Sequence, residues 1–390
     1  MTASGDMADG AGGPVPGDRP GWFARVLDAT VAGDEDPTAL GLCRIALVSV
    51  FTLSLLGHLG AVDEYFSNAS MVGGEFARQA FHSRLSLFLW FDEVWIVRTI
   101  FGIGVVAHLL WLVGLYTRPA AIVAFVVWAS MVGRNPLLYA MPDQLHTCLM
   151  LWLALAPGGR GLSLDARWRG KGGPVPVWCR RVIQLQLAVM YTATGLLKTG
   201  PTWKGDGTAI YYSVVNPYNR HVDVTRWLAM LQPYVLRPMT WAVLVWEVGF
   251  AGFTLVLWLR EATGKRWFPD LRKLWLGFGA LMHLGIWAMM YVVWFTPLVL
   301  AAYVAFVRPA EAARLVRWFT GSRGRAAGDG MHPLEVRRVA GDGGEGEDLG
   351  DVVRVDRGEA RDGSVDAING GLHEDEDLGV AAQLALPPVA

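Results

Sequence analysis

Charged residues and cysteines are both scarce in this chain, and each scarcity excludes classes of protein. Only 18% of the 390 residues are charged, against about a quarter in a typical soluble domain. The three cysteines, Cys43, Cys148 and Cys179, suit neither a disulfide framework nor a metal-ligand spacing, so we expect no metal site. The chain also has no Walker loop, no HExxH helix and no nucleophile elbow. Its basic clusters lack interleaved stacking aromatics, so we expect no nucleic-acid partner.

Apolar sequence, by contrast, is abundant. Hydrophobic residues make up 53% of the chain, which contains 18 tryptophans. Several apolar runs are long enough to span, or nearly span, a bilayer as helices. These runs cover residues 40–59, 96–116, 120–132, 145–156, 182–197, 239–258, 274–290 and 292–307. We therefore predict an all-α fold, a polytopic transmembrane bundle of about eight helices surrounded by membrane lipids.

The distribution of charge predicts the orientation of this bundle. Basic residues cluster at Arg118 and within residues 160–181, 260–273 and 308–325. With eight spans and a cytoplasmic N-terminus, all four clusters lie in the cytoplasm, as the positive-inside rule requires. The net acidic loop 61–94 then lies outside. We expect a multi-pass protein of the cell inner (plasma) membrane with both termini cytoplasmic.

The two ends of the chain differ from its body. Residues 326–390 contain 15 acidic and 5 basic residues, and their Gly/Asp/Glu-rich composition cannot bury a core. The first residues show no basic start followed by an apolar stretch, so no cleavable signal peptide is expected. We predict a disordered or interfacial leader (1–36), a transmembrane domain (37–325) and a disordered acidic tail (326–390).

Lys198 is the most informative single residue, because it directly follows the apolar run 182–197. A lysine in the middle of a membrane helix costs about 2.5–3.5 kcal/mol, and less near a helix end, so such a residue is a functional candidate. Burial also favours the neutral amine, which can accept a proton. The alternative is a lysine that snorkels from a helix end toward the membrane surface.

Other polar residues lie in or beside apolar runs. An Asp143–His146 pair at the outer end of the fourth run is a plausible proton relay for Lys198. His283 has a functional interpretation too, although each histidine can also simply bond a neighbouring helix. Glu247 is a lone carboxylate that must find a cation or donor, and an ion pair with Arg44 is as reasonable as any chemistry.

The segment 184–212 resembles the signature of the HTTM family, membrane domains related to vitamin K-dependent gamma-carboxylase. The matching positions are Tyr191, Gly195, Lys198, Trp203, Gly207 and Ala209. Looser single-residue matches are Arg44, Asp143 to His146, Ser163 to Asp165, Glu247 and His283.

This resemblance implies that Lys198 deprotonates a reduced, vitamin K-like quinone. It does not extend to peptide carboxylation, because the carboxylase helps to hold its peptide with a large extramembrane region, whereas an acidic tail follows here. The hypothesis is proton-transfer or redox chemistry on a lipid-soluble quinol, with Lys198, His146 and Asp143 catalytic and residues 203–218 as a lid. The predicted cofactor contacts are His283, Glu247, Trp203 and Tyr191. The alternative is a non-enzymatic lipid-binding, transport-accessory or scaffold protein, and the sequence names no protein partner.

Overall fold

The computed structural model of the chain describes residue 21, residues 27–264 and residues 270–320. The chain divides into two units, Met1–Ala326 and Ala327–Ala390, and every described residue belongs to the first. The predicted acidic tail, residues 326–390, lies outside the described residues, as does most of the predicted leader.

The described residues are almost entirely helical, as the apolar runs predict. Eight of the helices are long or apolar and coincide with the eight runs. They are α2 (Thr38–Leu56), α6 (Val94–Val113), α7 (Thr117–Arg134), α8 (Met141–Leu155), α10 (Trp178–Leu197), α14 (Arg237–Thr263), α15 (Arg272–Met289), and α16 (Phe295–Ala302) continued by η6 (Tyr303–Phe306).

Short elements connect these helices. They are η1 (Asp28–Ala32), η2 (Leu59–Ala61), α3 (Val62–Phe66), α4 (Gly74–Ala80), α5 (Leu87–Trp90), η3 (Pro136–Leu138), η4 (Gly158–Arg160), α9 (Leu164–Trp168), α11 (Pro201–Lys204), α12 (Ala209–Val215), α13 (Thr225–Leu231), η5 (Gln232–Leu236) and α17 (Pro309–Phe319). Two-residue strands β1 (Asp34–Glu35) and β2 (Val175–Pro176) pair antiparallel.

Three helical segments among the described residues are long and apolar enough to cross a membrane. They are Thr38–Phe66, Val94–Val113 and Thr225–Thr263, and a shorter apolar helix covers Phe295–Phe306. The all-α class is therefore confirmed and is compatible with a membrane protein. The larger number of spans and the orientation stay predictions.

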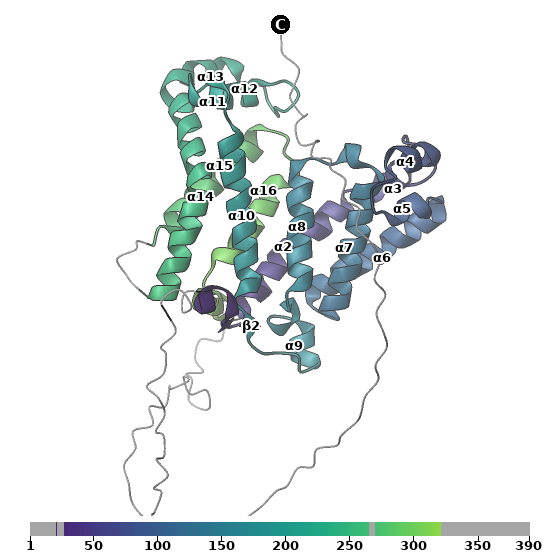
Figure 1. The fold of residues 1–390 in the computed structure, drawn as a ribbon. Helices are drawn as coiled ribbons and strands as arrows, with labels where there is room; N and C mark the ends of the chain where they lie inside the picture. Colours follow the sequence, from purple (N-terminus) through teal and green to yellow (C-terminus); the bar gives the residue numbers. More distant parts are fainter. Residues whose placement is uncertain (1–20, 22–26, 265–269, 321–390) are drawn as a thin grey trace, which may run out of the picture. The chain divides into compact units, whose positions relative to one another are not determined.

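A continuous apolar core joins the long helices. It includes Leu47 of α2, Trp111 of α6, Leu149 of α8, Leu187 of α10 and Phe250 of α14. Helices α10 and α14 pack along each other, as do α6 and α7. Helices α11, α12 and α13 lie across one end of α14, while α9 and β2 lie at the opposite end of the bundle (Figure 1).

The end of the bundle that carries β2 contains buried ion pairs. Arg180, at the start of α10, donates to both carboxylate oxygens of Glu35 in β1, at 2.9 and 2.7 Å. Residues 27–36, which the sequence assigns to the leader, thus pack against the domain. At the same end, Arg272 of α15 donates to both oxygens of Glu311 in α17, at 2.7 and 2.6 Å.

Candidate functional site

Lys198 is the residue at which α10 ends. Its backbone leaves the helical conformation at φ −75° and ψ 72°, and Gly200 and Pro201 follow, so the helix cannot continue. Its Nζ lies 2.5 Å from each carboxylate oxygen of Glu247, which projects from the middle of α14. The ammonium also lies 4.4 Å from the centre of the Trp203 ring, a cation–π distance. Lys198 is therefore held between a carboxylate and an aromatic face.

This pair is largely screened from solvent. The Lys198 side chain is 23% exposed and the Glu247 side chain 9% exposed. A buried carboxylate must be paired or neutralised, and Lys198 supplies that partner. Snorkelling into open solvent, the alternative interpretation of Lys198, therefore does not describe this lysine.

Close packing of α10 against α14 sets the position of the pair. A Cβ atom added at Gly195 would lie 2.9 Å from Cβ of Glu247 and 2.9 Å from Cγ2 of Val248, so only glycine fits without a shift. Gly195 is one turn before Lys198, which brings the end of α10 to the level of Glu247. The backbone N–H of Ala251 in α14 also donates to Oγ1 of Thr192 in α10, at 3.1 Å.

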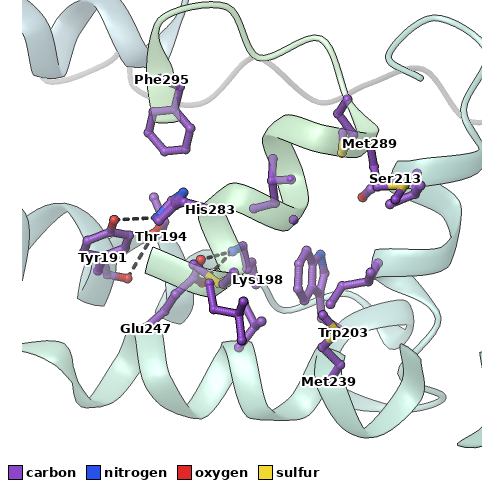
Figure 2. Close-up of a pocket in the computed structure, with 18 of the residues that line it drawn as sticks. Tyr191, Thr194, Lys198, Trp203, Ser213, Met239, Glu247, His283, Met289 and Phe295 are labelled. Carbon is purple, nitrogen blue, oxygen red and sulfur yellow. Dashed lines mark hydrogen bonds and ion pairs between the residues drawn. The ribbon is translucent and has the colours of Figure 1, made fainter. Parts of the chain in front are cut away.

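The pair forms part of the wall of a cavity of about 780 Å³. Its lining comes from α8, α10, α11, α12, α13, η5, α14, α15 and α16 and is mostly aliphatic, aromatic or methionine. Figure 2 shows Lys198, Glu247 and Trp203 together with Met239, Met289 and Phe295 around this space. Such a cavity suits an apolar molecule that carries a small polar group.

A second polar group lies on the same wall. The hydroxyl of Tyr191, two turns before Lys198 on α10, lies 2.7 Å from Nε2 of His283 in α15 and 3.2 Å from the hydroxyl of Tyr303 (Figure 2 shows the first of these contacts). Tyr191 and His283 are each 2% exposed, and both line the cavity. The Nδ1 atom of His283 is buried and has no hydrogen-bond partner in the described part of the chain.

All four predicted cofactor contacts lie together: Tyr191, Trp203, Glu247 and His283 line the same cavity as Lys198. Residues 203–218 also cover it, through Trp203 of α11 and Ile210, Ser213 and Val214 of α12. Tyr303 was not predicted. A tyrosine within the apolar run 292–307 was its only signal, because a buried phenol usually finds a hydrogen-bond partner.

The two remaining predicted catalytic residues lie elsewhere. His146 is stacked between Trp128 and Phe51, with ring centroids 3.9 and 4.5 Å away. Asp143 accepts a hydrogen bond from the backbone N–H of Ala140 at the start of α8, 2.8 Å away. Neither residue lines the cavity, although Met141 and Pro142 do.

His146 lies one turn beyond Asp143, on the face of α8 that packs against α2 and α7. Pro142, which lines the cavity, is four residues earlier on nearly the same face, so His146 lies about one turn too far along α8 to reach the cavity. The structure thus gives the predicted relay no contact with Lys198.

The alternative pairing of Glu247 with Arg44 is wrong. Arg44 is fully buried in α2 and donates to the backbone carbonyls of Gly158 and Leu162, at 2.9 and 2.7 Å. These bonds hold the turn after α8 in place, and Glu247 is instead satisfied by Lys198. From the sequence, only Arg44 was named as a basic partner for Glu247, and it is the packing of α10 on α14 that brings Lys198 to this carboxylate.

Gly207 has φ +66°, a conformation that favours glycine, and a Cβ there would lie 2.8 Å from Cγ of Arg237, so it allows the chain to re-enter beside α14. No group of three or more His, Cys, Asp or Glu residues with metal-site geometry occurs among the described residues.

Comparisons with protein-family models, with curated proteins and with solved structures found no match.

Proposed function

We propose that this chain is an integral membrane protein of HTTM type that performs proton-transfer chemistry on a lipid-soluble quinol. The observation that supports this most directly is the Lys198–Glu247 pair on the wall of an otherwise apolar cavity. The proposal includes a multi-pass arrangement of about eight spans in the inner membrane, with both termini cytoplasmic. Three segments that satisfy the length and composition of a span support it.

The residues of the cavity suit a quinol. Methionine, leucine and aromatic side chains would surround its ring and isoprenoid tail, while Lys198 offers a polar atom to one of its oxygens. Met190 and Met282 supply flexible apolar contacts on the same wall as Lys198. When bound, the quinol would supply a weakly acidic hydroxyl and two reducing electrons, which dissolved oxygen would accept.

The ion pair determines how Lys198 acts. An ammonium cannot accept a proton, so the base role requires that a proton first passes from Nζ to its partner Glu247, leaving a neutral amine beside a carboxylic acid. The Lys198 amine then takes the hydroxyl proton, and the restored ammonium stabilises the phenolate. Trp203 keeps the cation in place through its ring face.

A single substitution with a matched control tests this role. Lys198→Met removes the amine but keeps an apolar side chain of similar length, and Lys204→Met changes an exposed lysine on the same connection that does not line the cavity. We expect quinol-dependent oxygen uptake in membranes to fall at least about 100-fold for Lys198→Met, the scale of a lost general base, and to stay unchanged for Lys204→Met. Equal uptake by two folded variants would reject the base role.

A second candidate function is lipid binding without catalysis. The observation that favours it is that the cavity wall is apolar apart from groups that already satisfy one another, so an acyl chain alone would fill it. Mass spectrometry of molecules that co-purify with the protein distinguishes the two. A bound quinone supports the first proposal, whereas bound phospholipid together with unchanged uptake in Lys198→Met supports the second.

A further inference from the structure

A second cavity, of about 670 Å³, lies at the other end of α8. Met141 and Pro142 at the start of α8 line the first cavity, whereas Ala156, just beyond its end, lines the second. The 15 residues of α8 therefore separate the two by about 22 Å along the helix. The walls are the start of α7, the turn η4, helix α9 and the segment 171–174, at the end of the bundle where α9 lies (Figure 1).

This second cavity is basic. Four cationic side chains and one carboxylate line it: Arg118, Arg160, Arg169, Lys171 and Asp165. The single carboxylate therefore cannot neutralise the four cations.

Asp165 is fully engaged in holding the wall together. It accepts hydrogen bonds from the backbone N–H groups of Tyr116 and Thr117, from the Thr117 hydroxyl, and from Arg169, at 3.1, 2.8, 2.7 and 3.0 Å. Burial by itself would raise the pKa of Asp165, but these hydrogen bonds lower its pKa to about 2. The carboxylate is therefore ionised at neutral pH and balances Arg169, which also lies 4.2 Å above the Tyr116 ring.

The other three cations have no acidic partner among the residues that the structure describes. Arg160 donates to the backbone carbonyl of Pro174 at 2.6 Å, and the side chains of Arg118 and Lys171 make no hydrogen bond or ion pair with any described residue. Elsewhere three buried arginines are paired with carboxylates: Arg180 with Glu35, Arg181 with Glu261 and Arg272 with Glu311. The fully buried Arg44 and Arg134 instead donate to backbone carbonyls and, for Arg134, to the Ser70 hydroxyl.

We propose that this basic cavity binds a phosphate-bearing anion, either the head group of an anionic phospholipid or a soluble phosphate ester. Arginine and lysine make strong charge-assisted bonds to phosphate oxygens, and an excess of three cations matches a group with several such oxygens. The volume falls within the range of small-molecule sites. Gly158, Gly159, Gly172 and Gly173 form part of the wall, so the anion can approach the backbone closely. The site is independent of the quinol proposal.

Titrations of the full-length protein in neutral detergent test the proposal and separate the two sources of phosphate. The probes are phosphatidylglycerol, phosphatidylcholine as the zwitterionic comparison, and glycerol 3-phosphate. The test variant is Arg118→Gln/Lys171→Gln, which removes two exposed cations from the cavity. The matched control is Lys204→Gln/Arg226→Gln, which makes the same charge change at exposed positions that line neither cavity.

We expect the test variant to weaken binding of one anionic probe at least about tenfold, while the control stays within about twofold of the original protein. Selective loss of phosphatidylglycerol binding identifies a lipid head group, and selective loss of glycerol 3-phosphate binding identifies a soluble ester. The charge-preserving variant Arg118→Lys/Lys171→Arg should retain binding, which separates lost charge from altered folding. Equal affinities of the test and control variants for both anionic probes overturn the proposal, and so does a loss of phosphatidylglycerol binding that phosphatidylcholine binding shares to the same extent.

Discussion

Separating Lys198 from Glu247 is the most direct perturbation of the candidate site. Lys198→Met leaves a carboxylate that is 9% exposed with no cation beside it. Removing one partner of a buried pair costs about 3–5 kcal/mol in the free energy of unfolding, because the other charge is left unpaired. The Lys198 side chain is 23% exposed, so solvent screening reduces our expectation to about 2–3 kcal/mol.

A double-mutant cycle of Lys198 and Glu247 uses two further variants. Glu247→Leu leaves an ammonium nearer the solvent, for which we expect a loss of about 1–2 kcal/mol. The double variant Lys198→Met/Glu247→Leu replaces the pair by apolar side chains and should lie within about 1 kcal/mol of the original protein. The coupling energy between the two positions is then at least about 2 kcal/mol.

Equilibrium unfolding in mixed micelles, followed by tryptophan fluorescence, measures all four proteins under one condition. The 18 tryptophans provide a strong signal. If the two single losses simply add in the double variant, the side chains do not interact in the folded protein, and the paired site described here is wrong.

Three further predictions follow from other contacts. Tyr191→Phe removes the hydroxyl that contacts His283, and we expect a loss of about 1–3 kcal/mol in unfolding free energy, against almost none for the exposed Tyr212→Phe. Gly195→Val should lower the free energy of unfolding by about 1–3 kcal/mol, because the added Cβ would lie 2.9 Å from Cβ of Glu247. Its control is Gly252→Ala, where an added Cβ has no neighbour within 4 Å, and this variant should be slightly stabilised in the same unfolding assay.

The pKa of Asp165 is lowered from 3.8 in the unfolded chain to about 2 in the folded protein. The contribution of Asp165 to the free energy of unfolding is therefore complete above about pH 4 and is lost as the pH falls toward 2. Asp165→Asn should remove on the order of 1–2 kcal/mol of stability at neutral pH and flatten this part of the stability profile. Unchanged stability in any of the three test variants would contradict the contact on which that prediction rests.

The helical fold was largely predictable because each apolar run satisfies a local rule. Apolar runs of 12 to 21 residues favour helices whatever they pack against, and all eight predicted runs coincide with helices. The site was predictable only in part. Lys198 stood out because it directly follows an apolar run, and a lone Glu247 in another run required a partner.

The identity of that partner was not predictable, because several charged residues had the same local signal. Arg44, Lys198 and Glu247 each lie in or beside an apolar run, and nothing local says which of them meet. His146 shows the same problem, since only the packing of the neighbouring helices places it between Trp128 and Phe51 rather than in the cavity.

The amino-acid sequence by itself determined that this chain folds into apolar helices and that Lys198 marks the end of one of them, since both properties depend on neighbours along the chain. Only the tertiary structure decided that Lys198 meets Glu247, that Tyr191 meets His283, and that three cations near α9 have no carboxylate partner within the described part of the chain. Such contacts join residues far apart in the sequence, and they depend on which faces of the helices pack together.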